Sequence, residues 1–256
     1  MTLIVRVLFI SWILIGAGSL LAGPAQAHPE DEFCTADFGV DPALCRALQD
    51  LDRQDGSPAS ASELADRSAF ETFRLYIQIG VQHILPGGLD HILFVLALCF
   101  AAQSLRQQLL QVSVFTLAHT ATLGLVAAGV FAPPASIVEP LIALTIAGLA
   151  IEVMFFPRFT RWRLLVIFAF GLIHGMGFAG FFGTLGLPEG QFWSALIGFN
   201  IGVEIGQLTI IAAALLALWP LQQSLTARAA QVWIRIPVCS VIAVIGLTWT
   251  VQRIFG

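Results

Sequence analysis

The feature that most constrains this chain is a series of six apolar stretches, each close to the length that crosses a lipid bilayer. A transmembrane helix needs about 20 consecutive apolar residues. Only 11% of the residues are charged, too few for a soluble domain, a disordered chain or a nucleic-acid-binding protein. The sequence therefore predicts an all-α integral membrane protein with six transmembrane helices. The predicted spans cover 88–104, 109–130, 136–156, 164–186, 192–219 and 234–252.

A shorter apolar stretch, 70–85, opens the membrane domain (69–256) ahead of these spans. It carries Glu71, Arg74 and two glutamines, and it ends at Pro86-Gly87-Gly88, a sequence that breaks a helix. We therefore expect an interfacial or re-entrant half-helix here, outside the count of six spans.

Residues 1–27 have the pattern of a secretory signal peptide. Arg6 is followed by an apolar run that ends at Ala25-Gln26-Ala27, the small-x-small pattern that signal peptidase accepts. An uncleaved first transmembrane helix is the alternative. Cleavage predicts a protein of the bacterial inner (plasma) membrane, with its new N-terminus on the periplasmic or extracellular side.

The segment that follows, 28–68, is expected to be exported. It holds ten of the sixteen acidic residues, and Cys34 and Cys45 lie in it with ten residues between them. An oxidising compartment favours a disulfide between these two cysteines. The acids could gather a divalent cation, or they could form a solvated tail. Cys99 and Cys239 lie in apolar runs, which is typical of inert packing residues.

The arginines predict the orientation of the membrane domain. Cytoplasmic loops of membrane proteins are enriched in basic residues, and this chain has no lysine. Five arginines lie in three alternate loops, 105–108, 157–163 and 220–233, whereas the two opposite loops have none. If 70–85 does not cross the membrane, the arginine-bearing loops are cytoplasmic. If it crosses as a separate span, every loop changes side and the arginines lie outside, against the positive-inside rule.

A histidine, His83, precedes the Pro-Gly-Gly break, and an acid and a second histidine, Asp90-His91, follow it. Ionisable groups within a membrane are costly and therefore suggest function. Broken membrane helices place side chains around binding cavities, and imidazole with carboxylate suits Zn, Ni, Co or Fe. We expect an outer metal or proton site here. The alternative is an N-capping Asp90 beside two interfacial histidines.

His119, His174 and Glu204 lie eleven or twelve residues from the outer ends of their spans. That distance predicts a second site at a depth of ~17 Å, below the outer one unless the break dips inward. Thr116, one turn from His119, could orient its ring. Glycines around His174 would let neighbouring helices approach closely. Either histidine alone could instead form a helix–helix hydrogen bond.

The span 192–219 carries a polar face. Asn200, Glu204 and Gln207 are spaced i, i+4 and i+7, and such a face must contact the protein interior or a wet cavity. Glu152, near the cytoplasmic end of another span, is predicted as an exit ligand or as an acid that snorkels to the surface.

Four stretches resemble the HupE/UreJ family of bacterial membrane proteins: HILPGGLDHILFVLAL, FTLAHTATL, FAFGLIHGMGFAG and GFNIGVEIGQL. The resemblance covers about 70–255 and implies a signal peptide, six spans and nickel or cobalt uptake for metalloenzyme maturation. The family's metal motif has five residues between His and Asp-His, whereas six separate His83 from Asp90 here. The second motif of the family has two His-Gly pairs and a Glu in one helix. This chain has only His174-Gly175 there, and it therefore resembles the divergent second branch of the family.

The leading hypothesis is a secondary permease for a divalent transition metal, Ni or Co, with Zn as a further candidate. Release of a cargo ion suits mixed nitrogen and oxygen ligands better than thiolates. A chain without lysine has no P-loop, so an ion gradient or the membrane potential must drive transport. The predicted ligands are His83, Asp90, His91, His119, His174 and Glu204, supported by Thr116, Glu152, Asn200 and Gln207.

Two other functions fit the same residues. In a membrane-embedded zinc hydrolase, histidines and an Asp would hold Zn while Glu204 acts as general base. A catalytic Zn stays bound through purification, whereas a transported ion exchanges. An accessory subunit without transport activity is the third alternative, and it predicts that His91→Ala leaves metal accumulation unchanged. The expected partners are the metal ion and the bilayer.

Overall fold

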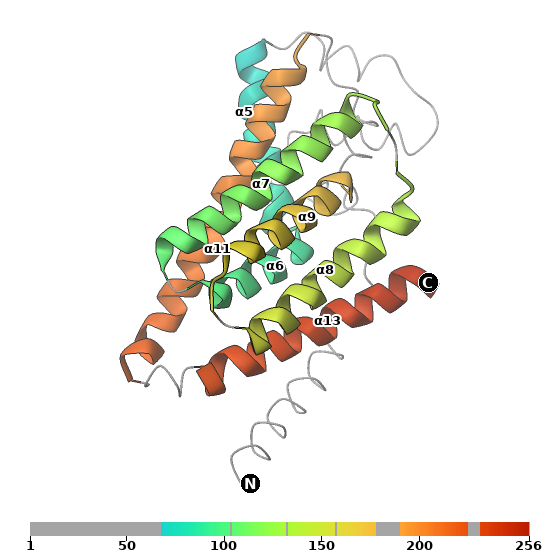
Figure 1. The fold of residues 1–256 in the computed structure, drawn as a ribbon. Coiled ribbons are helices and arrows are strands. Elements are labelled where there is room, and N and C mark those ends of the chain that lie inside the picture. Colours follow the sequence, from blue (N-terminus) through green and yellow to red (C-terminus); the bar gives the residue numbers. More distant parts are fainter. Residues whose placement is uncertain are drawn as a thin grey trace.

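The computed structural model describes residues 68–255, except 103, 132, 157, 178–189 and 225–230. The predicted signal peptide, the acidic segment and the Cys34–Cys45 disulfide lie outside the described residues. The described elements are helices, as predicted (Figure 1). They are α5 (Ala69–Ile84), α6 (Leu89–Ala101), α7 (Leu105–Ala127), α8 (Ala135–Phe155), α9 (Arg161–Gly177), α11 (Phe192–Ser224), the π-helix η1 (Gln231–Arg235) and α13 (Ile236–Phe255).

Four helical segments are long and apolar enough to cross a membrane alone: α7, α8, 192–219 of α11, and 233–255, which ends in α13. Helices α5 and α6 qualify only as a pair, bent by 71° at the break between them. The 13 residues of α6 rise only ~20 Å, short of a bilayer core of ~30 Å. The predicted full span over 88–104 is therefore corrected to one half of a bent pair. The described residues give four or five candidate spans, and six are not confirmed.

Local sequence explains where α5 begins and ends. Ser68 caps its N-terminus, since the Ser68 hydroxyl accepts from the Glu71 backbone N–H and the Glu71 carboxylate accepts from the Ser68 backbone N–H. The helix stops before Pro86, which cannot donate a helical hydrogen bond. A side chain at Gly88 would clash with the carbonyl oxygen of His83, so the chain can turn sharply there only with glycine.

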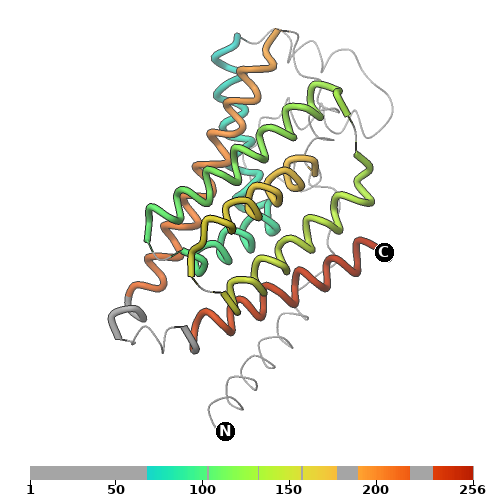
Figure 2. Tube along the Cα trace, in the orientation of Figure 1, coloured from blue at the N-terminus to red at the C-terminus, as the bar shows by residue number. Residues whose placement is uncertain are grey.

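Helix α5 runs into the bundle alongside the first half of α11 (Figure 2). Glycines recur every four residues on α11, at 198, 202 and 206, and each faces α5. An added Cβ at Gly202 would clash with the carbonyl oxygen of Ile77, and one at Gly80 with that of Phe199. Small residues at this spacing let two backbones approach closely. The structure gives the half-helix expected at 70–85 as α5, one arm of a bent helix pair, and the break at its end lies inside the bundle.

A buried arginine joins three helices at the end of the bundle where α6 ends. The Arg163 side chain donates to the Ala101 carbonyl oxygen at 2.8 Å, to the Phe156 carbonyl oxygen and to Glu152 Oε1 at 2.8 and 3.1 Å. A charge can be buried this deeply only when it is paired and hydrogen-bonded. Glu152, predicted as an exit ligand or a snorkelling acid, thus lies in an ion pair that connects α8 to α9.

We expect Gly202→Ala to lower the free energy of unfolding by about 1–3 kcal/mol, because the added methyl group overpacks the α5–α11 contact. Gly148→Ala is the matched control: the nearest atom to its added Cβ is in the Phe170 ring at 3.9 Å. Alanine favours a helix, so this control should unfold at the same temperature as wild type or higher. Thermal unfolding in detergent measures both, and equal melting temperatures would contradict the packing argument.

Candidate metal centre

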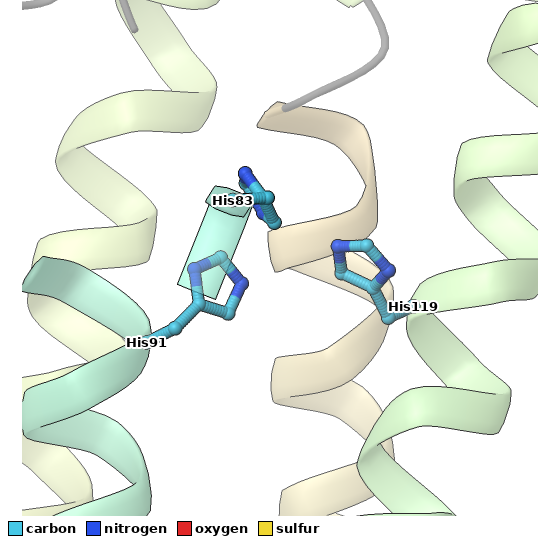
Figure 3. A group of neighbouring side chains, drawn as sticks. All are labelled: His83, His91 and His119. Atoms are coloured by element: carbon cyan, nitrogen blue, oxygen red, sulfur yellow. The ribbon is translucent and has the colours of Figure 1, made fainter. Parts of the chain in front are cut away.

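Three histidines from three helices meet inside the bundle (Figure 3). His83 lies in the last turn of α5, His91 in the first turn of α6 and His119 in α7. One ring nitrogen of each lies within 4.8 Å of the others, and all three side chains are buried. We call these residues the three-His group. Imidazole nitrogens are preferred ligands of Zn, Cu, Fe and Ni, so the group can hold a transition metal.

The bend between α5 and α6 makes this meeting possible. It places the rings of His83 and His91 with their centroids 4.6 Å apart, although seven residues separate them in sequence. The His91 and His119 rings are 5.9 Å apart. The prediction that these histidines occupy two separate levels is therefore wrong. The break dips inward because α5 itself runs into the bundle.

His174 of α9 lies directly beside the three-His group. Its ring centroid is 5.3 Å from that of His91, and the residue is buried. Its Nε2 lies 2.7 Å from the Thr145 hydroxyl of α8, which donates its only proton to the Ile142 carbonyl oxygen. In the tautomer that matches this donation, the ring donates from Nε2 to the hydroxyl and Nδ1 carries the lone pair.

Several buried ring nitrogens have no hydrogen-bond partner within the described part of the chain. They are Nε2 of His91, both nitrogens of His119 and Nδ1 of His174. Buried polar atoms in folded proteins are nearly always hydrogen-bonded, and each exception costs about 1–3 kcal/mol. Coordination of a metal ion would satisfy lone pairs of this kind, so the donor set fits a transition metal.

Aromatic rings and close helix packing surround the histidines. Phe199 lies 5.4 Å from the His83 ring and Phe94 lies 5.1 Å from that of His174. An added Cβ at Gly171 would lie 2.6 Å from the Phe115 carbonyl oxygen, which confirms the expected close approach around His174. An apolar shell of this kind limits the access of water to a bound ion.

Asp90 faces a partner that the sequence analysis missed. Its carboxylate accepts two hydrogen bonds from the Arg253 guanidinium of α13, at 2.9 and 3.1 Å. The Asp90 oxygens are not among the ligand atoms that lie within 4.8 Å of one another in the three-His group. No local signal could have revealed this pair, because 163 positions separate the two residues.

The polar face of α11 lies against α7. Thr116, expected to orient His119, donates instead to Gln207, and both residues are buried. Glu204 accepts from Ser113 and lies outside the three-His group. We call this row the α7–α11 polar seam. Its hydrogen bonds run from Ser113 to Glu204 (3.2 Å), from Thr116 to Gln207 (2.9 Å) and from Thr120 to Asn200 (2.5 Å).

The family model for HupE / UreJ proteins, in its second form, matches residues 59–253. The chain belongs to the HupE/UreJ family. The match spans all the described helices up to the last turn of α13, and it confirms the resemblance predicted from the four motifs. No curated protein and no solved structure matches the chain.

The family's first motif is present here with one additional residue, and the geometry tolerates it. The interval between His83 and Asp90 contains the Pro-Gly-Gly break, not a continuous helix. An inserted residue in a helix would rotate the following side chains by about 100°, whereas a break can absorb it. His83 and His91 consequently still lie on the same centre.

Replacing Thr145 by valine should lower the free energy of unfolding by about 1–3 kcal/mol, because His174 Nε2 then loses its buried hydrogen-bond partner. Valine keeps the shape of the side chain, so lost packing contributes little. Thr145→Ser retains the hydroxyl and should remain close to wild type. Denaturant unfolding in micelles compares them; a serine variant as unstable as the valine variant would refute the assigned hydrogen bond.

Proposed function

We propose that this HupE/UreJ family member is a secondary permease for a divalent transition metal, with Ni or Co as cargo and Zn as a third candidate. The observation that carries the proposal is the buried three-His group within a bundle of membrane helices. The resemblance to nickel and cobalt uptake proteins supports the same cargo. The ion is substrate here and is not a resident cofactor.

In the proposed mechanism the cargo ion first binds the three-His group and the Nδ1 lone pair of His174. These donors are neutral imidazoles, which bind borderline metal ions firmly but exchange them more readily than thiolates do. The surrounding phenylalanine rings exclude bulk water, so the ion must leave through groups of the protein itself.

The α7–α11 polar seam supplies a route away from the histidines. Thr116 is one turn from His119 along α7 and is bonded to Gln207 of α11. Glu204 lies on the same face of α11 as Gln207. Oxygen donors hold late transition metals more weakly than imidazole does, so we propose Glu204, Gln207 and Asn200 as onward ligands.

The alternative function, a zinc hydrolase, uses the same histidines but requires Glu204 to lie close to the bound ion. A catalytic zinc site has three protein ligands, an open position and a general base close to the bound water. Glu204, the base expected for this alternative, is hydrogen-bonded to Ser113 and lies outside the three-His group. Zn retained at one equivalent through purification, without exchange for added Ni or Co, would favour the hydrolase.

We also propose the orientation in a bacterial inner membrane. Five of the seven described arginines lie at one end of the bundle, in or beside the α6–α7 and α8–α9 loops and in η1, whereas Arg74 of α5 and Arg253 of α13 do not. The five are Arg106, Arg158, Arg161, Arg163 and Arg235. The positive-inside rule places that end in the cytoplasm. If α5 and α6 form one broken crossing, residue 68 is periplasmic, in agreement with a cleaved signal peptide.

We expect His91→Ala to reduce the accumulation of Ni and Co at least about tenfold. Mutation of a residue that only hydrogen-bonds to a metal ligand already lowers metal affinity by about 10–100-fold. The measurement is uptake into proteoliposomes that contain the full chain, tested with Ni, Co and Zn. Cys99→Ala is the matched control, because Cys99 is a further potential metal donor on α6 and lies outside the three-His group.

His91→Asn is the second variant. It keeps a polar side chain and can be tested if the alanine variant does not fold. Wild-type vesicles that accumulate none of the three metals above this pair of variants would refute the permease. Uptake by the variants equal to wild type would favour the accessory subunit.

A topology reporter tests the orientation. Alkaline phosphatase inserted after Phe131, between α7 and α8, should be active because that loop is proposed to be periplasmic. Green fluorescent protein inserted after Arg158, between α8 and α9, should fluoresce because that loop is proposed to be cytoplasmic. The reverse pattern would overturn the orientation without affecting the metal centre.

A further inference from the structure

The C-terminal helix supplies a cation to the residue next to the metal centre. Arg253 lies in the last turn of α13 and Asp90 immediately precedes His91. The two side chains are 12% and 19% exposed, and they form a two-pronged ion pair with 2.9 and 3.1 Å bonds. This geometry is the strong form of a guanidinium–carboxylate contact.

Arg253 has contacts that do not depend on Asp90. Its Nη1 also donates to the Glu139 backbone carbonyl oxygen of α8 at 3.1 Å, and its guanidinium lies 5.5 Å from the centre of the Trp249 ring. If the carboxylate moved away, these contacts would still hold the guanidinium in place. The pair can therefore open by rotation of Asp90 alone.

A divalent cation in the three-His group would compete for the same carboxylate. The histidine ligands are neutral, so they leave both charges of the ion uncompensated in a low-dielectric interior. Asp90 adjoins one of these ligands in sequence, but one carboxylate cannot fully neutralise both a guanidinium and a metal ion. Asp90 must turn from Arg253 to reach the centre, since its oxygens lie outside the group of ligand atoms.

We propose that Arg253 is a positioning residue of the metal centre, which holds the Asp90 carboxylate in the metal-free protein and releases it to an incoming divalent cation. This inference rests on the proposed permease function and adds to it a device for release. Because Arg253 stays beside the centre, it continues to attract Asp90 and weakens metal binding. An ion held by a contested ligand leaves faster than one held by a dedicated ligand.

The test is Ni titration of the full chain in detergent. Arg253→Gln removes the competitor and should bind Ni about tenfold more tightly, the size of effect known for close charge pairs. Asp90→Asn removes the ligand and should bind Ni about tenfold more weakly. The double variant should gain much less affinity over Asp90→Asn than Arg253→Gln gains over wild type, because the Arg253 charge acts mainly through Asp90 and only to a smaller extent directly on the site. Arg74→Gln, which removes an exposed arginine from α5, should match wild type.

A merely structural role for Arg253 predicts the opposite sign. Weaker or unchanged Ni binding by folded Arg253→Gln would overturn the inference. It would also be overturned if Arg253→Gln raised the affinity by the same factor in the Asp90→Asn background as in wild type. If Arg253→Gln does not fold, Arg253→Lys replaces it in the test. A lysine ammonium binds a carboxylate less firmly than the two-pronged guanidinium does, so the affinity for Ni should rise measurably but less than tenfold. Absence of binding of Ni, Co and Zn alike by wild type would instead refute the proposed function.

Discussion

A break in a helix at the depth of the membrane is tolerated only where protein, and not lipid, surrounds the exposed backbone. Lipid offers no hydrogen bonds, and each unsatisfied backbone group there costs several kcal/mol. The turn between α5 and α6 meets this constraint with its own bonds, from Leu85 N–H to Val81, from Gly87 N–H to Gln82 and from Ile92 N–H to Gly88. The three-His group depends on this turn, because His83 and His91 lie on its two sides.

The depth of the turn is set by the glycines that join α5 to α11. Without their close contact α5 would stay at the surface, and His83 would not reach His119. Two arginines then join neighbouring helices, one at each end of the bundle. Arg163 ties α6, α8 and α9 at one end, and Arg253 connects α13 to α6 and α8 at the other. Each pairs with an acid, Glu152 or Asp90, that the sequence offers as a candidate metal ligand.

The sequence predicts the helices well because apolar length is a local property. Each expected stretch contains a helix, and the Pro-Gly-Gly break was placed correctly. The histidines of the centre were also identified, because ionisable residues are scarce in so apolar a domain. The depth of the histidines differs from the prediction because the prediction counts residues along straight helices, whereas α5 and α6 are bent by 71° at the break.

The remaining partners could not have been predicted from one sequence. Thr145 is an ordinary helix residue until His174 is found 2.7 Å away, and Arg253 resembles a tail residue that obeys no orientation rule. Both partners depend on helices that are distant in the chain. Pairings of this kind can be learned only from a three-dimensional structure. The residue types and their rarity can be learned from the sequence alone.

The double charge of the ion that the three-His group would receive has an electrical consequence for the proposed permease. The ligands stay in the protein, so an ion that crosses without a coupled ion carries both of its charges through the membrane potential. Moving one charge across 100 mV corresponds to about 2.3 kcal/mol, so a divalent ion would gain about 4.6 kcal/mol. With about 1.4 kcal/mol for each factor of ten, that is a concentration ratio of more than a thousandfold at equilibrium. In a bacterium with a negative interior, voltage alone would be sufficient to concentrate a scarce metal.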